Sequence, residues 1–349
     1  MDTSSLASKR LDVSGLDEAT ELFYEKGWTD GLPVVPPTEE RVLQFLEFAG
    51  KAPSDVLGTV PVRGRVVTAE KVAVSAAMAG CKPEYMPVVL AAVEGMLQEQ
   101  FNVHGTSAST GGSAVMLVVN GPARQALGLN SGGNLFGPGP TFRANATIGR
   151  AIRLFLINVL GNVPGVLDRS TFGHGGKYSM CIAEDEEHSP WEPFHVERGF
   201  RPDQSTVTVM TVQAPWQSPT RRGETPEAVL AAIADTIKGV GPNNRELTVI
   251  IGGELMGPIR EAEWTKQQVK EFLAEHSRRT AQDWASVYKA EEPPPEKAQE
   301  LVPVLSNPEE VIVLAAGGLA GSQAAVVPHW GGGINTRSVT REVDTSRLL

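Results

Sequence analysis

Cysteine and long apolar runs are both scarce in this sequence, and each shortage excludes a class of protein. The two cysteines, Cys81 and Cys181, are too few for a disulfide framework, which indicates a reducing compartment. The longest apolar-leaning run, at 151–159, is interrupted by Arg153 and Asn158, so we expect no membrane span. The N-terminus lacks the apolar segment of a secretory signal. These absences predict a cytoplasmic protein.

Positive charge is also in short supply. The chain carries 31 Lys and Arg against 41 Asp and Glu, which gives a formal net charge of −10. This balance argues against nonspecific binding to nucleic acid or to an anionic membrane surface. Hydrophobic residues make up 41% and charged residues 21%, which is typical of a globular protein. A chain of 349 residues suffices for one large core or two smaller ones.

Strand-like and helix-like segments alternate along the chain. This alternation predicts an α/β fold with a mixed sheet flanked by helices, and it allows two subdomains. We divide the chain into a flexible N-terminal arm (1–20), a main α/β region with the candidate site (21–200), a second α/β region (201–290), a charged proline linker (291–300) and a C-terminal strand and glycine-rich segment that packs back on the core (301–349).

The positions of several helices and strands can be predicted from residue spacing and from the residues that begin or end them. Residues 16–26 have helical spacing, and Thr38 is a capping residue for the helix that follows the proline-rich segment. Val60–Val67 has the composition of a strand. Gly80 ends one predicted helix, and the segment 81–83 is expected to open the next.

Cys81 is the sharpest candidate for covalent or redox chemistry. It is placed at a predicted helix N-terminus with Lys82 beside it, and both features favour a thiolate. The alternative is a small buried residue at a tight joint between two helices. Cys181 lies in an apolar strand and is interpreted as a core residue.

The segment 102–112 is rich in hydroxyl, amide and imidazole side chains. Such a loop can offer backbone N–H groups and hydroxyls to an anionic or carbonyl-bearing ligand. We include Ser107 and Thr110 as binding residues, together with Asn120 at the end of the next strand. His104 could act as a general base, an acid or a metal ligand. A solvated turn is the competing interpretation.

A second polar group follows at 130–150. Asparagine supplies both a donor and an acceptor, and arginine supplies a fork for a carboxylate or phosphate. A helix start near Asn145 would add a positive dipole end. The group contains no nucleotide-binding motif. Loop and cap functions are the alternative for any single residue, and binding is favoured for the set of Asn130, Asn134, Arg143, Asn145 and Arg150.

Three more charged residues are candidates for acid–base work. Lys177 and Glu184 lie within one loop–strand–turn unit and could form an acid–base pair or a substrate clamp. Asp30 is presented on a proline-stiffened segment, which suits catalysis or binding, although an Asx-turn explains it equally well. No histidine pair has ligand spacing such as HExxH, so we assign no metal, and the sequence identifies no cofactor.

Five segments carry a resemblance to a known family. They are WTDGLPVVPPTEERV, AGCKPEY, GRAIRL, the KYS…AEDEEHSPWEP stretch and the late GG-x-AG-x-x-AAVVP segment. In them the chain resembles bacterial proteins associated with the UGSC family, which is named for a selenocysteine-Gly-Ser-Cys motif. This chain has neither UGSC nor CGSC. The resemblance therefore implies a companion subunit in a thiol- or selenol-dependent system, with Cys81 as the position for a redox or covalent role.

The leading hypothesis is an enzyme subunit of a thiol-dependent, hetero-oligomeric system that acts on a small anionic organic substrate. Cys81 would be the nucleophile or redox centre, and His104 with Lys177 or Glu184 would transfer protons. One rival is a thiol-independent hydrolase or lyase that uses His104, Asp30 and Glu184. The other rival is a noncatalytic partner subunit of a UGSC-type protein.

Overall fold

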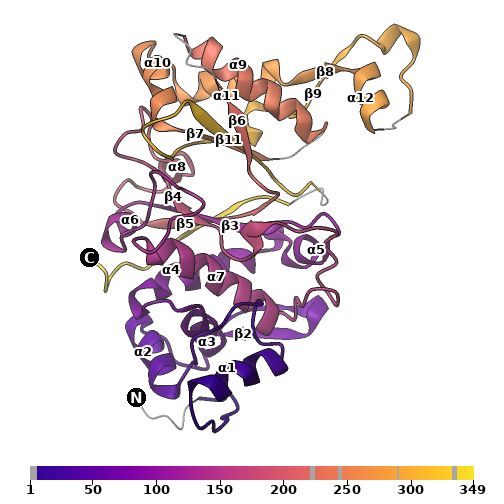
Figure 1. The fold of residues 1–349 in the computed structure, drawn as a ribbon. Coiled ribbons are helices and arrows are strands. Elements are labelled where there is room, and N and C mark those ends of the chain that lie inside the picture. The colour runs from indigo at the N-terminus through magenta and orange to yellow at the C-terminus, as the bar shows by residue number, and fades with distance from the viewer. Residues whose placement is uncertain (1–5, 221–224, 243–245, 289–290, 332–335) are drawn as a thin grey trace.

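The fold is a mixed α/β architecture, as predicted, and it contains two four-stranded sheets flanked by helices (Figure 1). The computed structural model describes residues 6–220, 225–242, 246–288, 291–331 and 336–349. The helices in chain order are α1 (Leu16–Glu25), α2 (Glu39–Ala49), α3 (Ala69–Ala79), α4 (Met86–Met96), α5 (Val103–Ala108), α6 (Ala123–Ala126), α7 (Arg143–Asn158), α8 (Phe194–Glu197), α9 (Pro226–Ile237), α10 (Met256–Glu261), α11 (Lys266–His276) and α12 (Ala281–Tyr288).

The first sheet has the order β12-β5-β3-β4. β3 and β4 run parallel, whereas β5 is antiparallel to both β3 and β12. Its strands are β3 (Ala114–Asn120), β4 (Cys181–Ala183), β5 (Thr206–Val212) and β12 (Val339–Glu342).

The second sheet has the order β10-β7-β11-β6. Here β10 and β7 run parallel, and β11 is antiparallel to both β7 and β6. Its strands are β6 (Trp216–Pro219), β7 (Leu247–Ile251), β10 (Val311–Ala315) and β11 (Gln323–Pro328). Two short ladders complete the strands: β1 (Val56–Val60) with β2 (Arg65–Thr68), and β8 (Arg278–Thr280) with β9 (Leu301–Pro303).

The two sheets share one pattern, a parallel pair followed by two antiparallel strands, and they exchange their edge strands. The chain leaves β5 of the first sheet to form edge strand β6 of the second, and it leaves β11 of the second to form edge strand β12 of the first. The two crossing segments pair at Val212 and His329. This arrangement ties the two halves of the molecule together.

Strand alternation explains how four layers are stacked. In β3, Leu117 joins the core beneath the N-terminal helices, whereas its neighbour Met116 faces the second sheet. In β7, Val249 joins the core beneath α9 and α11, whereas Ile250 faces the first sheet. Because both sheets are covered on both faces, their central strands are almost wholly apolar. Figure 1 shows the resulting order of helices, sheet, sheet and helices.

Several local predictions are confirmed, and one strand prediction is wrong. The predicted helix at 16–26 is α1, and the Thr38 side chain caps α2 by accepting from Arg41 N. Val60–Val67 is not one strand. Pro61 opens a 3₁₀ turn and Gly64 adopts a φ of +58°, so the segment folds into the β1–β2 hairpin.

The predicted segment boundaries do not follow the sheets. β5, from the predicted second region, belongs to the first sheet, and the C-terminal segment is divided between both sheets. The predicted linker at 291–300 lies between α12 and β9. Residues 1–5 of the predicted arm lie outside the described residues, but the N–H groups of Ala7 and Ser8 donate to Glu70, so this part of the arm is bound to the core.

Within the described residues, no helix combines the length and apolar character needed to cross a bilayer.

Candidate functional site

A hollow beside α5 and α7 brings together segments that are far apart in the sequence. It is open to solvent, and the free space within it is about 20 Å³. The first residues of β3, the end of β5 and the loop before β4 form the remaining walls. Its polar and charged lining includes Thr106, Ser107, Arg153, Asn162, Lys177 and Thr211.

Lys177 is the central charged group of one wall. Its Nζ donates to Asp168 Oδ2 at 2.7 Å, to Asp168 Oδ1 at 2.9 Å and to Ser170 Oγ at 2.5 Å. Arg153 Nη1 lies 3.3 Å from the same Asp168 carboxylate. His174 shapes the turn that places Lys177, because its Nδ1 accepts from Gly176 N. One buried carboxylate therefore holds two cations at the hollow.

The pKa of Lys177 and the pKa of Asp168 are both lowered, for different reasons. Burial lowers the pKa of Lys177, and the Asp168 carboxylate only partly opposes the effect. Burial alone would raise the pKa of Asp168, but the Lys177 and Ser170 hydrogen bonds outweigh it and hold that pKa below its usual value. A lysine with a lowered pKa can lose its proton more readily than an exposed one.

Arg63 from the β1–β2 hairpin holds α5, whose residues Thr106 and Ser107 line the hollow. Its Nε donates to His104 Nδ1 at 3.2 Å, and Nη2 donates to Ser107 Oγ at 2.5 Å. Its Nη1 donates to Leu160 O at 3.3 Å, which connects the hairpin to the end of α7. His104 and Ser107 both lie in α5 rather than in a loop.

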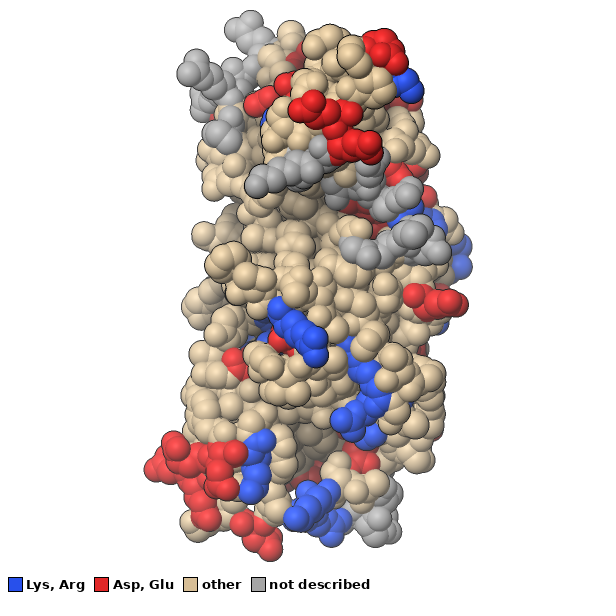
Figure 2. All heavy atoms as spheres, turned by 90° about the vertical axis from the view of Figure 1, so that its right-hand side faces the viewer, with Lys and Arg blue, Asp and Glu red and all other residues tan. Residues whose placement is uncertain are grey.

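Positive charge exceeds negative charge around the hollow. Two cations that line the hollow, Arg153 and Lys177, lie beside the single carboxylate of Asp168. Figure 2 views the molecule from the side of α5 and shows Lys and Arg groups across the middle of this face, with groups of both signs towards its ends. In a protein with a net charge of −10, this local excess favours an anionic ligand.

Asn162 adds an unsatisfied polar atom to the lining. The residue is 2% exposed, and its Oδ1 has no hydrogen-bond partner in the described part of the chain. A buried amide oxygen without a partner is costly, so it usually meets a water or a ligand. Asn162 therefore supplies the hollow with an acceptor for a donor group on a bound molecule.

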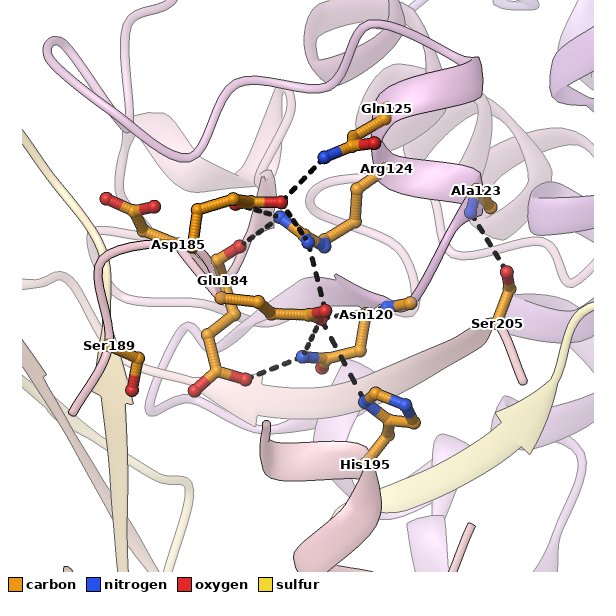
Figure 3. Close-up of polar contacts among 12 residues, drawn as sticks. Asn120, Ala123, Arg124, Gln125, Glu184, Asp185, Ser189, His195 and Ser205 are labelled. Atoms are coloured by element: carbon orange, nitrogen blue, oxygen red, sulfur yellow. Dashed lines mark hydrogen bonds and ion pairs between the residues drawn. The ribbon is translucent and has the colours of Figure 1, made fainter. Parts of the chain in front are cut away.

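Glu184 belongs to a different buried cluster, at the opposite end of β4 from Lys177 (Figure 3). Its Oε2 accepts from Asn120 Nδ2 at 2.6 Å and from Phe194 N at 2.8 Å. Full burial raises the pKa of Glu184 to about 7, although the charge of Lys266 opposes the shift. The predicted pairing of Lys177 with Glu184 is therefore wrong, because each residue has its own partners and β4 separates them.

Arg124 connects the Glu184 cluster to the acidic turn. It donates to the carbonyl of Glu184 at 2.7 Å, to Glu186 Oε2 at 2.9 Å and to both carboxylate oxygens of Glu187. Gln125 Nε2 donates to Glu187 Oε1 at 2.7 Å. These bonds give Glu186 and Glu187 a structural role, whereas Glu184 Oε1 is buried and has no hydrogen-bond partner among the described residues.

Cys81 lies in the apolar core rather than at a helix N-terminus. It is 6% exposed and packs in the core shared by the N-terminal helices and the first sheet. Burial raises its pKa to about 12. The predicted thiolate is therefore wrong. The prediction also assumed a helix N-terminus at Cys81, but a 3₁₀ turn at Pro83–Tyr85 follows this residue and α4 begins only at Met86. A helix dipole acts over its first turn alone.

Asp30 and Arg150 bind each other. Arg150 donates to the two Asp30 oxygens at 2.8 Å each and to Pro33 O at 2.8 Å. Burial alone would raise the pKa of Asp30, but the Arg150 hydrogen bond and charge lower it below its usual value. Arg143, the first residue of α7, donates to Gly80 O and so caps the end of α3. These two arginines anchor the proline-rich segment and α3 to α7.

The predicted asparagine pocket is also a structural unit. Asn130 N donates to Asn145 Oδ1 at 2.8 Å, and Asn145 Nδ2 donates to the carbonyls of Asn130 and Cys181. Asn134 is exposed in a turn with a φ of +53°. Thr110 is exposed and accepts a backbone hydrogen bond from Thr171 N, which ties the two loops beside the hollow together.

Ser107 and Lys177, which the sequence predicts as site residues, both line the hollow. Most of the residues around them there are not predicted by the sequence. Arg63 was overlooked because it lies inside a wrongly predicted strand. Arg153 was noted only as an interruption of an apolar run. Asn162 and Asp168 follow α7 in a loop without a recognisable motif.

Comparison of the chain with protein-family models, with curated proteins and with solved structures finds no match. The resemblance to UGSC-associated proteins therefore stays a prediction. Within the described residues, no three His, Cys, Asp or Glu side chains are grouped so that they could hold a metal ion. The functional argument consequently depends on the geometry of the hollow.

Proposed function

We propose that this protein is an enzyme that performs thiol-independent acid–base chemistry on a small organic anion bound in the hollow between α5, α7 and the loop before β4. The observation that carries the proposal is the excess of positive charge around Lys177, in a polar hollow of a protein that is acidic as a whole. Arg153, which lines the hollow, would attract and orient the anion.

Lys177 is the proposed proton-transfer group. Lys177 lines the hollow, and burial lowers its pKa, which brings the amine closer to the range where it can accept a proton. Asp168 and Ser170 hold this amine in place. Cys81 takes no part in the proposal, because its buried thiol lies in the apolar core and has a raised pKa.

Replacement of Arg153 by methionine tests anion binding. Met keeps much of the apolar stem and removes one of the two cations that line the hollow. We expect Arg153→Met to weaken the binding of pyruvate and oxalate, measured by isothermal titration calorimetry, by about tenfold or more, or ~1.4 kcal/mol.

The matched control is Arg201→Met. Arg201 is also paired with an aspartate, Asp203, but its side chain is 67% exposed and lies outside the hollow. We expect this variant to bind both anions as the wild type does. Equal affinity in the wild type and Arg153→Met, or no binding by the wild type, would contradict the proposed function.

A further inference from the structure

A second and larger cavity lies among the N-terminal elements of the molecule. The free space within it is about 300 Å³, against about 20 Å³ in the hollow beside α5 and α7, and the two share no lining residue. Its walls come from the arm at 6–13, the proline-rich segment at 36–37, α1, α2 and α3, which lie towards the lower end of Figure 1. Protein interiors contain few voids larger than a water molecule, so free space of this size suits a ligand.

The walls of this N-terminal cavity are mainly apolar. Leu22, Val42 and Val74 contribute aliphatic side chains from α1, α2 and α3. Phe23 and Trp28 also line the cavity, and their rings lie 6.1 Å apart in a tilted arrangement. An apolar cavity of roughly 150 Å³ can stay dry and bind benzene. With about 300 Å³ of free space, this cavity has room for a larger aromatic molecule.

The arm forms one wall of the cavity and is fixed there by two carboxylates. Glu70 of α3 is 4% exposed, and its two oxygens accept from Ala7 N at 2.9 Å and from Ser8 N at 2.7 Å. Further along the arm, Arg10 forms an ion pair with Glu39 of α2. The arm is therefore a bound part of the cavity wall, and it is attached to two of the helices that form the other walls.

The charged groups of the lining compensate each other. Arg10 and Glu39 are paired, and Glu70 is engaged by two backbone N–H groups. Lys9 and Asp12, which carry opposite charges, complete the charged lining. A ligand with a net charge would therefore lose hydration in this cavity without meeting a compensating excess of the opposite sign. This balance favours an uncharged ligand.

We propose that the N-terminal cavity binds an uncharged small molecule with an aromatic body, which packs against Phe23 and Trp28. The gain comes from apolar surface that leaves water, and contacts between tilted rings add to it. The inference goes beyond the proposed function and does not depend on it, because the cavity and the hollow have different lining residues.

A fluorescence titration tests this inference. The intact protein is titrated into N-phenyl-1-naphthylamine, an uncharged aromatic probe whose emission rises in apolar surroundings. We expect the wild type to bind the probe with a dissociation constant of about 100 μM or tighter, as a modest binding energy per atom gives for a ligand of this size. Val74→Trp places an indole in the free space, so we expect it to weaken binding by at least about tenfold.

The matched control is Val287→Trp. It makes the same change in α12, at a residue that is 57% exposed and lies outside the cavity, and we expect it to bind the probe as the wild type does. If Val74→Trp does not fold, Leu22→Trp fills the cavity from α1 instead. Equal binding by the filling variant and the wild type, or no binding by the wild type, would overturn the inference.

The charge of the ligand is tested with a second probe. The related 1-anilinonaphthalene-8-sulfonate carries a negative charge on a similar aromatic body, and we expect the wild type to bind it more weakly than the uncharged probe. Equal or tighter binding of this anion, abolished by the same filling variant, would overturn the assignment to an uncharged ligand.

Discussion

Replacement of Asp168 by alanine is expected to lower the free energy of unfolding by about 3–5 kcal/mol. The carboxylate is 4% exposed and binds Lys177 Nζ at 2.7 Å and Arg153 Nη1 at 3.3 Å. Its removal leaves two partly buried cations facing each other without a counter-charge. Denaturant-induced unfolding of the wild type and the variant at neutral pH measures the difference.

The control is Asp203→Ala, which removes a carboxylate that is 73% exposed and paired with Arg201. We expect a change below about 1 kcal/mol, because exposed ion pairs contribute little. The pH dependence gives a second check. Since pairing lowers the pKa of Asp168 in the folded state, its contribution is present above the unfolded pKa of about 3.9 and is lost as the pH falls further. Similar losses for both variants at neutral pH would contradict this interpretation.

Glu184→Gln is expected to stabilise the protein above pH 7, by about 2 kcal/mol. Burial raises the pKa of Glu184 to about 7, so at higher pH the wild type ionises a fully buried carboxyl group. The glutamine carbonyl can still accept from Asn120 Nδ2 and Phe194 N without carrying a charge. Unfolding experiments between pH 4 and pH 9 measure the effect.

The direction follows from proton binding. Between the unfolded pKa of about 4.3 and the folded pKa of about 7, folded Glu184 retains a proton that the unfolded chain has released. The wild type therefore loses stability as the pH rises through this window, whereas Glu184→Gln does not. The exposed Glu261 provides a control, and Glu261→Gln should follow the wild-type curve. A Glu184→Gln variant that parallels the wild type at every pH would contradict the raised pKa.

The mixed α/β fold class could be predicted because it depends on local patterns. Alternating strands and helices, the cap at Thr38 and the apolar strand at 114–120 all follow from neighbouring residues. The exchange of β6 and β12 between the sheets could not be predicted in this way. It depends on the crossing of two distant segments, which meet at Val212 and His329.

The candidate site was harder to predict because ion-pair partners come from distant parts of the sequence. Lys177 and Glu184 are close in sequence, but β4 carries the chain away from the hollow between them. Arg150 and Asp30 are 120 residues apart and form a two-bond pair that neither local segment reveals. The prediction that Cys81 lies at a helix N-terminus was wrong because a 3₁₀ turn follows it, so α4 begins later in the chain than the sequence pattern indicates.

Hydrogen exchange into a bound substrate tests the central claim most directly. Small oxo acids, including pyruvate and 2-oxobutyrate, are incubated with the protein in D₂O, and loss of the C–H signals beside the carbonyl is followed by NMR. We expect the wild type and Cys81→Ala to catalyse this exchange and Lys177→Met to slow it by about 100-fold, the low end of a general-base contribution. Exchange that survives in Lys177→Met, or that no oxo acid undergoes with the wild type, would contradict the account.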